Sequence, residues 1–296
     1  MALTQIIDRA NRKPNALFLP TKYTEESALH GYMSSVPYAT YKAAGVMSKY
    51  DITKFARKTP FRYFNEEDTT QTRANQVGTA LRVLIFDEPN FEQKYMLLDE
   101  IEDRRKPEFK QAAKAIGADN VFVAKETRSM RGMKEAILAN DESRAALEID
   151  GPTLATCFYK HADTGVLLRA KFDKITEKEG FIIKPVKSVS RLDMPSLIFN
   201  ASYHIEAAMC VDGHKSITGM ELDAVKFIFV EDTFPYQVAV VYLDDISIEI
   251  GRRTYSAALA EYKEALDNKE SINNNEPSFM SGLPEWAMRD YEDIVI

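Results

Sequence analysis

Apolar residues recur at helical spacing in the N-terminal half of the chain. Residues 70–86 read TQTRANQVGTALRVLIF, and Leu81 and Leu84 share one helix face with Val77. Pro89 follows just beyond the expected helix end. The pattern predicts a buried helix over 70–86.

The flanking segments carry weaker patterns. Residues 48–64, SKYDITKFARKTPFRYF, predict a short capped helix followed by a turn. Residues 91–147 are rich in charge, Ala and Lys, and helical patterns at 108–116 and 129–147 predict a helical insert that is mobile or peripheral. Residues 1–45 mix Pro, Ser, Tyr and Thr without a sustained period, which indicates an irregular arm with short elements.

The C-terminal half has the pattern of strands alternating with helices. Strand-like segments occupy 156–162, 165–175, 180–188, 224–232 and 236–244. The first two surround the turn residues Asp163, Thr164 and Gly165 and predict a hairpin. One helix is expected from Pro195 to Gly213 and another over 246–266. The pattern predicts one α/β domain over residues 46–296, a central mixed sheet flanked by helices at 70–86 and 195–211 with N-terminal helical additions.

Composition narrows the class of protein. The 296 residues are 45% hydrophobic and carry a net charge of −7, which argues against a general polyanion-coating protein but allows a local basic groove. Two cysteines in apolar stretches, no apolar run of roughly 20 residues and no secretion signal predict a cytoplasmic protein without a membrane span. Three basic clusters are candidates for such a groove, although each cluster alone is more typical of a solvated face: Arg104, Arg105 and Lys106; Arg128, Arg131 and Lys134; Lys184, Lys187 and Arg191.

Several common sites lack support in the sequence. The four histidines form no pair at metal-ligand spacing, and the two cysteines are far apart, which argues against zinc. No glycine-rich phosphate loop is present.

Asp173 and Lys187 are the candidate chemical residues. Each stands near the end of one of two neighbouring predicted strands. A carboxylate and a lysine brought together there could hold a divalent cation and steady charge on a phosphate. One carboxylate alone is a poor Mg²⁺ site.

Six segments, in order, resemble the RecE-type exodeoxyribonuclease VIII family of PD-(D/E)xK nucleases. They are SKYDITKFARKTPFRYF, GTALRVLIFDEPNFEQKY, DTGVLLRAKFD, IIKPVKS, YHIEAAMCVDG and FIFVEDTFPYQVAVVYLDDISIEIGRRTY, followed by LPEWA. The resemblance covers roughly residues 45–290 and implies a PD-(D/E)xK nuclease-like core. It also implies a phage or prophage origin, a bacterial host cytoplasm and a homo-oligomer.

Comparison with the family's motifs shows several departures. Asp173 matches the first metal aspartate and Lys187 the lysine. Arg82 replaces a histidine, and Pro185 replaces the second metal aspartate. In YHIEAAMC, Glu206 and Cys210 replace a glutamine and an aromatic residue.

These departures oppose metal binding. Arg82 puts a permanent cation at a ligand position, and Pro185 offers no side-chain oxygen. Arg82 could pair directly with Asp173 and turn a metal site into an ion pair. Alternatively, Glu206 or Glu148 could supply the missing carboxylate, and a site of Asp173, Glu206 and Lys187 would bind Mg²⁺ or Mn²⁺ if Arg82 moved away.

Two functions follow from the resemblance. The favoured one is a catalytically degraded nuclease-fold protein that binds DNA or a host or phage protein partner in recombination or anti-defence, without a cofactor. Candidate DNA-binding residues are Arg82, Lys184, Lys187 and Arg191. The alternative is an active Mg²⁺-dependent 5′ to 3′ double-stranded DNA exonuclease that works with a single-strand annealing protein.

Overall fold

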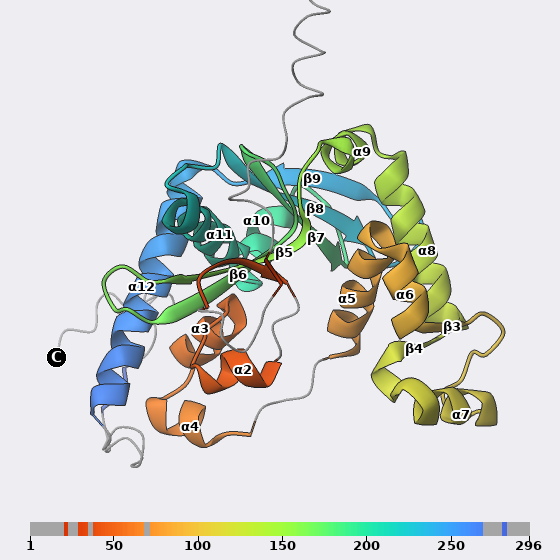
Figure 1. Cartoon of the computed structure of the whole chain (residues 1–296), viewed down its shortest axis with the longest axis horizontal. Coiled ribbons are helices and arrows are strands. Elements are labelled where there is room, and N and C mark those ends of the chain that lie inside the picture. Colours follow the sequence, from red (N-terminus) through yellow and green to blue (C-terminus); the bar gives the residue numbers. More distant parts are fainter. Residues whose placement is uncertain (1–20, 23–28, 35–37, 68–71, 269–279, 283–296) are drawn as a thin grey trace, which may run out of the picture.

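The centre of the molecule is a mixed β-sheet (Figure 1). The computed structural model describes residues 21–22, 29–34, 38–67, 72–268 and 280–282. Within these residues the main sheet has seven strands in the order β1-β2-β5-β6-β7-β8-β9. They are β1 (Thr21–Lys22), β2 (Gly31–Ser34), β5 (Thr153–Lys160), β6 (Leu167–Ile175), β7 (Glu179–Val186), β8 (Ala224–Glu231) and β9 (Val238–Tyr242). The predicted α/β fold with a central mixed sheet is confirmed, and the N-terminal segment adds two short strands at one edge.

Strand direction changes at the middle of the sheet. β5 and β6 form the predicted antiparallel hairpin, while β7 and β8 run parallel along Glu179–Val186. The ladder between β6 and β7 is short, with Lys174 opposite Phe181 and Ile175 opposite Gly180. Beyond these pairs β7 has no ladder partner on its β6 side within the described residues.

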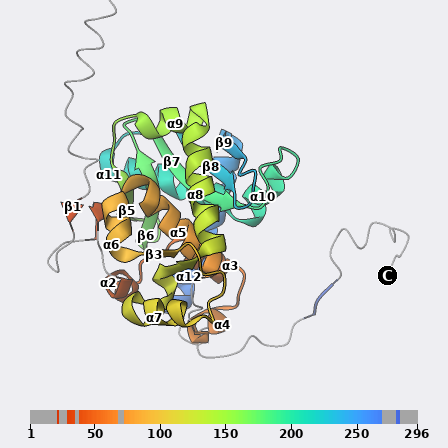
Figure 2. The same ribbon diagram turned by 90° about the vertical axis from the view of Figure 1, so that its right-hand side faces the viewer.

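Helices cover both faces of the sheet. On one face α11 (Tyr203–Thr218), α12 (Asp245–Asp267) and α3 (Lys49–Ala56) bury the larger hydrophobic core. On the other face α5 (Arg73–Phe86) and α8 (Ala124–Ala139) pack against Ile183, Ile228 and Val230. Figure 2 shows α8 crossing in front of the sheet.

The insert before the sheet is only partly as predicted. Its helices are α6 (Glu88–Lys94), α7 (Pro107–Ile116), α8, α9 (Asp141–Glu148) and the 3-10 turn η2 (Ala118–Asn120). The predicted helix over 129–147 is wrong as a single element, because the Asn140 side chain accepts the Ser143 N–H at 3.0 Å and starts a new helix. A parallel pair, β3 (Met96–Leu98) and β4 (Val121–Val123), was missed because three residues show no alternation. The small helices α2 (Tyr38–Ala43) and α4 (Pro60–Asn65) precede this region.

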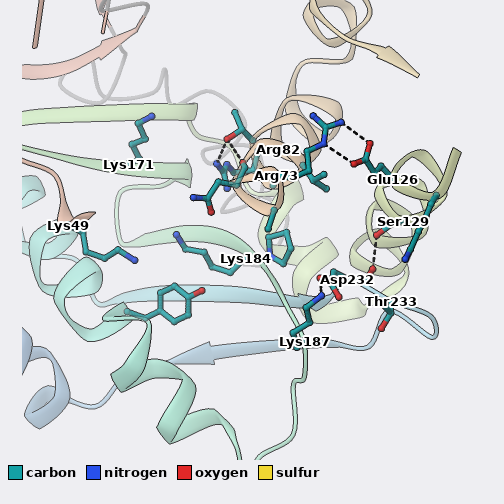
Figure 3. A pocket seen from close by; sticks show the side chains of 18 residues that line it. Lys49, Arg73, Arg82, Glu126, Ser129, Lys171, Lys184, Lys187, Asp232 and Thr233 are labelled. Atoms are coloured by element: carbon teal, nitrogen blue, oxygen red, sulfur yellow. Dashed lines mark hydrogen bonds and ion pairs between the residues drawn. The ribbon is translucent and has the colours of Figure 1, made fainter. Parts of the chain in front are cut away.

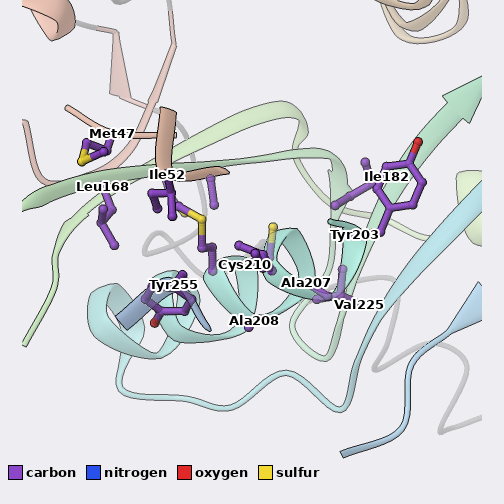
Figure 4. Packing of buried hydrophobic residues seen from close by; sticks show 14 of the residues in the cluster. Met47, Ile52, Leu168, Ile182, Tyr203, Ala207, Ala208, Cys210, Val225 and Tyr255 are labelled. Atoms are coloured by element: carbon purple, nitrogen blue, oxygen red, sulfur yellow. The ribbon is translucent and has the colours of Figure 1, made fainter. Parts of the chain in front are cut away.

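The predicted helix from Pro195 to Gly213 is also two helices. α10 (Met194–Asn200) ends before Ser202, whose φ of 56° breaks the helical path, and α11 begins at the next residue. α11 continues past Gly213 to Thr218. A Cβ on Gly213 would lie 2.6 Å from the Tyr159 ring, so this glycine allows close packing on β5 and does not end the helix. Figure 4 shows neighbouring α11 residues Ala207, Ala208 and Cys210 within this core.

No helix in the described ranges is long and apolar enough to cross a membrane.

Candidate functional site

A basic pocket of about 720 Å³ lies between α5, α8, the middle of β6 and the C-terminal end of β7 (Figure 3). We call it the basic pocket. Its charged lining residues are Lys49, Arg73, Arg82, Lys125, Lys171, Lys184 and Lys187 together with Glu126 and Asp232. Seven cationic and two acidic side chains thus line it among the described residues. The pocket suits a polyanion although the whole chain is acidic.

Asp173, a buried residue, is paired with Arg82, which lines the pocket. Asp173 lies on β6 and faces α5, where Arg82 Nε is 3.3 Å from its Oδ1. The other oxygen, Oδ2, accepts the Ile183 backbone N–H at 2.7 Å. Burial raises the pKa of Asp173, while Arg82 and the Ile183 N–H act in the opposite direction. The ion pair expected from the sequence is present.

Pro185 lies on β7 and packs against α5. A Cβ added to Gly78 on α5 would lie 3.6 Å from the Pro185 ring, so helix and strand pack closely there. Ile183 directs its N–H toward β6, and because N–H groups alternate along a strand, the missing donor of Pro185 belongs to the same side. That side has no ladder partner at this level. Proline is therefore tolerated inside this strand without loss of a sheet hydrogen bond.

Glu206 on α11 is held by two lysines. Lys184 Nζ donates to its Oε1 at 2.7 Å, and Lys49 Nζ lies 3.3 Å from its Oε2. Figure 3 shows the two lysines directed toward each other from β7 and α3. Burial alone would raise the pKa of Glu206, but Lys184 and Lys49 together lower it to about 2. Glu206 thus acts as the shared partner of two pocket cations.

The other candidate residues are spread over a wider area. Lys187 lines the pocket and donates to Asp232 Oδ2 at 2.6 Å, with its side chain 86% exposed. Arg191 lies outside the basic pocket, in a separate depression beside β9. Glu148 is at the end of α9, 72% exposed and 4.0 Å from Arg144, and does not line the pocket. Cys210 is fully buried in the core, where burial raises the pKa of its thiol.

The residues present do not fit a divalent cation. Both Asp173 oxygens have protein partners, Pro185 provides no ligand, and Glu206 is neutralised by two lysines. Across the part of the chain that the structure describes, no group of three or more His, Cys, Asp or Glu residues is placed to hold a metal ion. Mg²⁺ and Mn²⁺ need free oxygen ligands, and this donor set is engaged with cations instead.

Sequence reasoning missed much of the pocket. Lys49, Arg73, Lys125 and Lys171 come from four different elements, α3, α5, α8 and β6, so no local cluster identifies them. Conversely, the clusters around Arg104 and Arg128 pair with acids: Arg104 with Glu126, Arg105 with Asp103, Arg128 with Glu102, Arg131 with Asp99 and Lys134 with Glu88. Among the missed residues, Lys171 alone had a signal in the sequence, because the alternation of β6 turns Lys171 to the same face as Asp173.

Lys125 and Lys171 are the least neutralised cations of the pocket. Neither forms an ion pair with any described residue, whereas the other five pocket cations do. Loss of hydration, with Arg169 and Arg82 nearby, lowers the pKa of Lys171 to about 8. At pH 7 most Lys171 side chains therefore still carry a positive charge available to a ligand.

Comparisons with known proteins support the fold. No protein-family model and no curated protein matches the chain. The crystal structure of a candidate exonuclease from Eubacterium rectale matches with a TM-score of 0.55 and 12% identity, covering 88% of this chain and 100% of that one. An alkaline exonuclease from Laribacter hongkongensis matches with a TM-score of 0.31 and 15% identity over 79% of this chain and 98% of its own. The chain thus has an exonuclease-like fold.

Proposed function

We propose that this chain is a RecE-like nuclease-fold protein that has lost the metal-dependent reaction and binds the phosphate backbone of DNA in its basic pocket. The observation that carries the proposal is the Arg82–Asp173 ion pair beside a pocket lined by seven cations, one of which is Arg82. By the sequence resemblance, Asp173 stands where the family has a metal aspartate. Phosphates attract such a lining through charge and counterion release.

The setting of this function follows from the sequence resemblance. We place the protein in phage or prophage DNA recombination or anti-defence, as a homo-oligomer in the cytoplasm of the bacterial host. The segments that carry the resemblance include strand β6 with Asp173 and strand β7 followed by Lys187.

DNA binding is tested by fluorescence anisotropy with a labelled oligonucleotide. The variant Lys125→Gln/Lys187→Gln removes two exposed pocket cations, and Lys160→Gln/Lys178→Gln removes two exposed lysines outside the pocket. We expect the pocket variant to lose roughly tenfold or more in affinity and the control to stay near wild type, because only pocket lysines contact phosphate. Equal losses in both variants, or no binding by the wild type, would reject the proposal.

Loss of catalysis is tested separately with linear duplex DNA and Mg²⁺ or Mn²⁺. We expect no digestion by the wild-type protein, because Asp173 is paired with Arg82. Digestion that disappears in Asp173→Asn would instead establish the alternative, an active exonuclease. If the protein neither digests nor binds DNA, a protein partner becomes the remaining function of this fold.

A further inference from the structure

The loop between β8 and β9 carries an exposed aromatic residue at the rim of the basic pocket. Asp232 and Thr233 line the pocket, and Phe234 follows directly. Phe234 is 86% exposed. Single exposed apolar residues are common on protein surfaces. A functional role for Phe234 therefore has to be argued from the contacts that anchor its loop and from its neighbours.

The loop is anchored to the molecule on both sides of Phe234. Ser129 Oγ on α8 donates to the Asp232 carbonyl at 2.7 Å, and Lys187 donates to the Asp232 side chain (Figure 3). Tyr236, two residues later, packs against α8 so closely that a Cβ on Gly132 would lie 2.2 Å from its ring. The loop is thus held at Asp232 and at Tyr236, while Phe234 between them projects outward.

Phe234 also has a fixed neighbour. Its ring lies edge-on to the Tyr236 ring, with centroids 6.2 Å apart and planes at 88°. This contact leaves most of the Phe234 ring accessible, as its 86% exposure shows. An accessible ring on an anchored loop loses little conformational freedom when a flat ligand stacks on it.

We propose that Phe234 stacks on an unpaired base of a nucleic acid whose phosphates lie in the basic pocket, so that the preferred ligand is single-stranded DNA or DNA with an unpaired end. This inference rests on the proposed function and adds the ligand class. Bases inside an intact duplex stack on each other and offer Phe234 no face, whereas a single strand offers every base. Proteins that bind single strands combine a cationic groove with such aromatic side chains.

Three probes of equal length separate base stacking from charge. They are a mixed-sequence single strand, the same strand with abasic sites in place of bases, and the blunt duplex. We expect the wild type to bind the mixed-sequence strand most tightly. Phe234→Ala should weaken that binding roughly tenfold, since one base–aromatic stack is lost, and leave the abasic strand and the duplex unchanged. Phe234→Tyr should retain the wild-type preference.

Tyr242→Ala is the matched control, because Tyr242 is an aromatic residue 66% exposed at the far end of β9. It should bind all three probes like the wild type. Size-exclusion chromatography and thermal melting of each variant show whether assembly and folding are intact.

The outcomes distinguish this inference from the function on which it rests. If the pocket lysines are needed for DNA binding but Phe234→Ala binds the mixed-sequence strand like the wild type, or weakens all three probes equally, the stacking role is overturned and DNA binding stands. If Phe234→Ala changes the oligomeric state, the residue belongs to an interface between copies and the stacking role is likewise overturned. If no probe binds the wild type, both ideas fail.

Discussion

Glu206 is a single acidic residue that pairs with two of the cations lining the basic pocket. Its carboxylate stands between Lys184 and Lys49, and the lowered pKa of about 2 records how strongly they favour its charged form. Removing one partner of such a buried group leaves uncompensated charge, which is costly. Glu206 therefore stabilises the two lysines at the places where they line the pocket.

The pH dependence of stability tests this role. The pKa of Glu206 is lowered from its ordinary value of 4.5 to about 2, so its contribution to stability is present above pH 4.5 and is lost as pH falls toward 2. We expect Glu206→Gln to be less stable than the wild type by about 3 kcal/mol near neutral pH. The difference should shrink between pH 4.5 and 2, as measured by urea unfolding at a series of pH values.

Glu221→Gln serves as the comparison for this experiment. Glu221 pairs with Lys215 on the surface, with its side chain 71% exposed. Exposed pairs contribute little, so this variant should match the wild type across the range. A difference for Glu206→Gln that stays constant from pH 7 to 2 would show that its carboxylate does not carry the stabilising charge.

At the scale of elements, α5 and the part of β7 that does not pair with β6 determine what the site can bind. Gly78 and Arg82 are one helical turn apart on α5, and they face Pro185 and Asp173 respectively. The helix thus brings a guanidinium to Asp173 and packs closely over Pro185 on the neighbouring strand. The site therefore depends on α5 and β7 together.

We expect a metal site to form when positions 82 and 185 are changed together. Pro185→Asp adds a carboxylate on the α5 face of β7, and Arg82→His removes the cation that pairs with Asp173 and adds an imidazole ligand. We expect the double variant to bind Mn²⁺ measurably in isothermal titration calorimetry. Pro185→Asp alone should not bind, because Arg82 still neutralises the neighbouring carboxylate.

A third change makes this result specific. Adding Asp173→Asn to the double variant should abolish the heat of Mn²⁺ binding while a thermal melt shows that the fold persists. Unchanged binding in that triple variant would mean that the metal lies elsewhere and that Asp173 and position 185 do not form a common site.

Most of the elements could be predicted from the sequence because their patterns are long. The hairpin around Gly165 and the helices α5 and α12 follow from periods sustained over many residues. The break at Ser202 could not be predicted, since its left-handed backbone occurs at a residue that is neither glycine nor proline. Pro185 was recognised as unusual, but the reason that the strand tolerates it is the divergence of β6, which is a tertiary feature.

At the scale of the whole molecule, charge is distributed unevenly. The chain carries a net charge of −7, yet the basic pocket gathers seven cations against two acids from its described residues. Net charge argued against a general polyanion-coating protein, but it could not locate the pocket, because Lys49, Lys125 and Lys171 are more than 40 residues apart in sequence and meet only in the fold. The surrounding negative charge would repel DNA elsewhere, which favours one binding site.

A salt titration tests this local concentration of charge. Each phosphate contact with single-stranded DNA contributes a slope of about −0.7 to a plot of log affinity against log salt concentration. We expect Lys125→Gln and Lys171→Gln, measured separately at pH 7, each to reduce the slope by about 0.7, because neither lysine is neutralised by an ion pair with a described residue. Lys160→Gln, which removes the same charge away from the pocket, should leave the slope unchanged. Equal changes in all three variants would mean that DNA responds to the overall charge of the protein and not to contacts within the basic pocket.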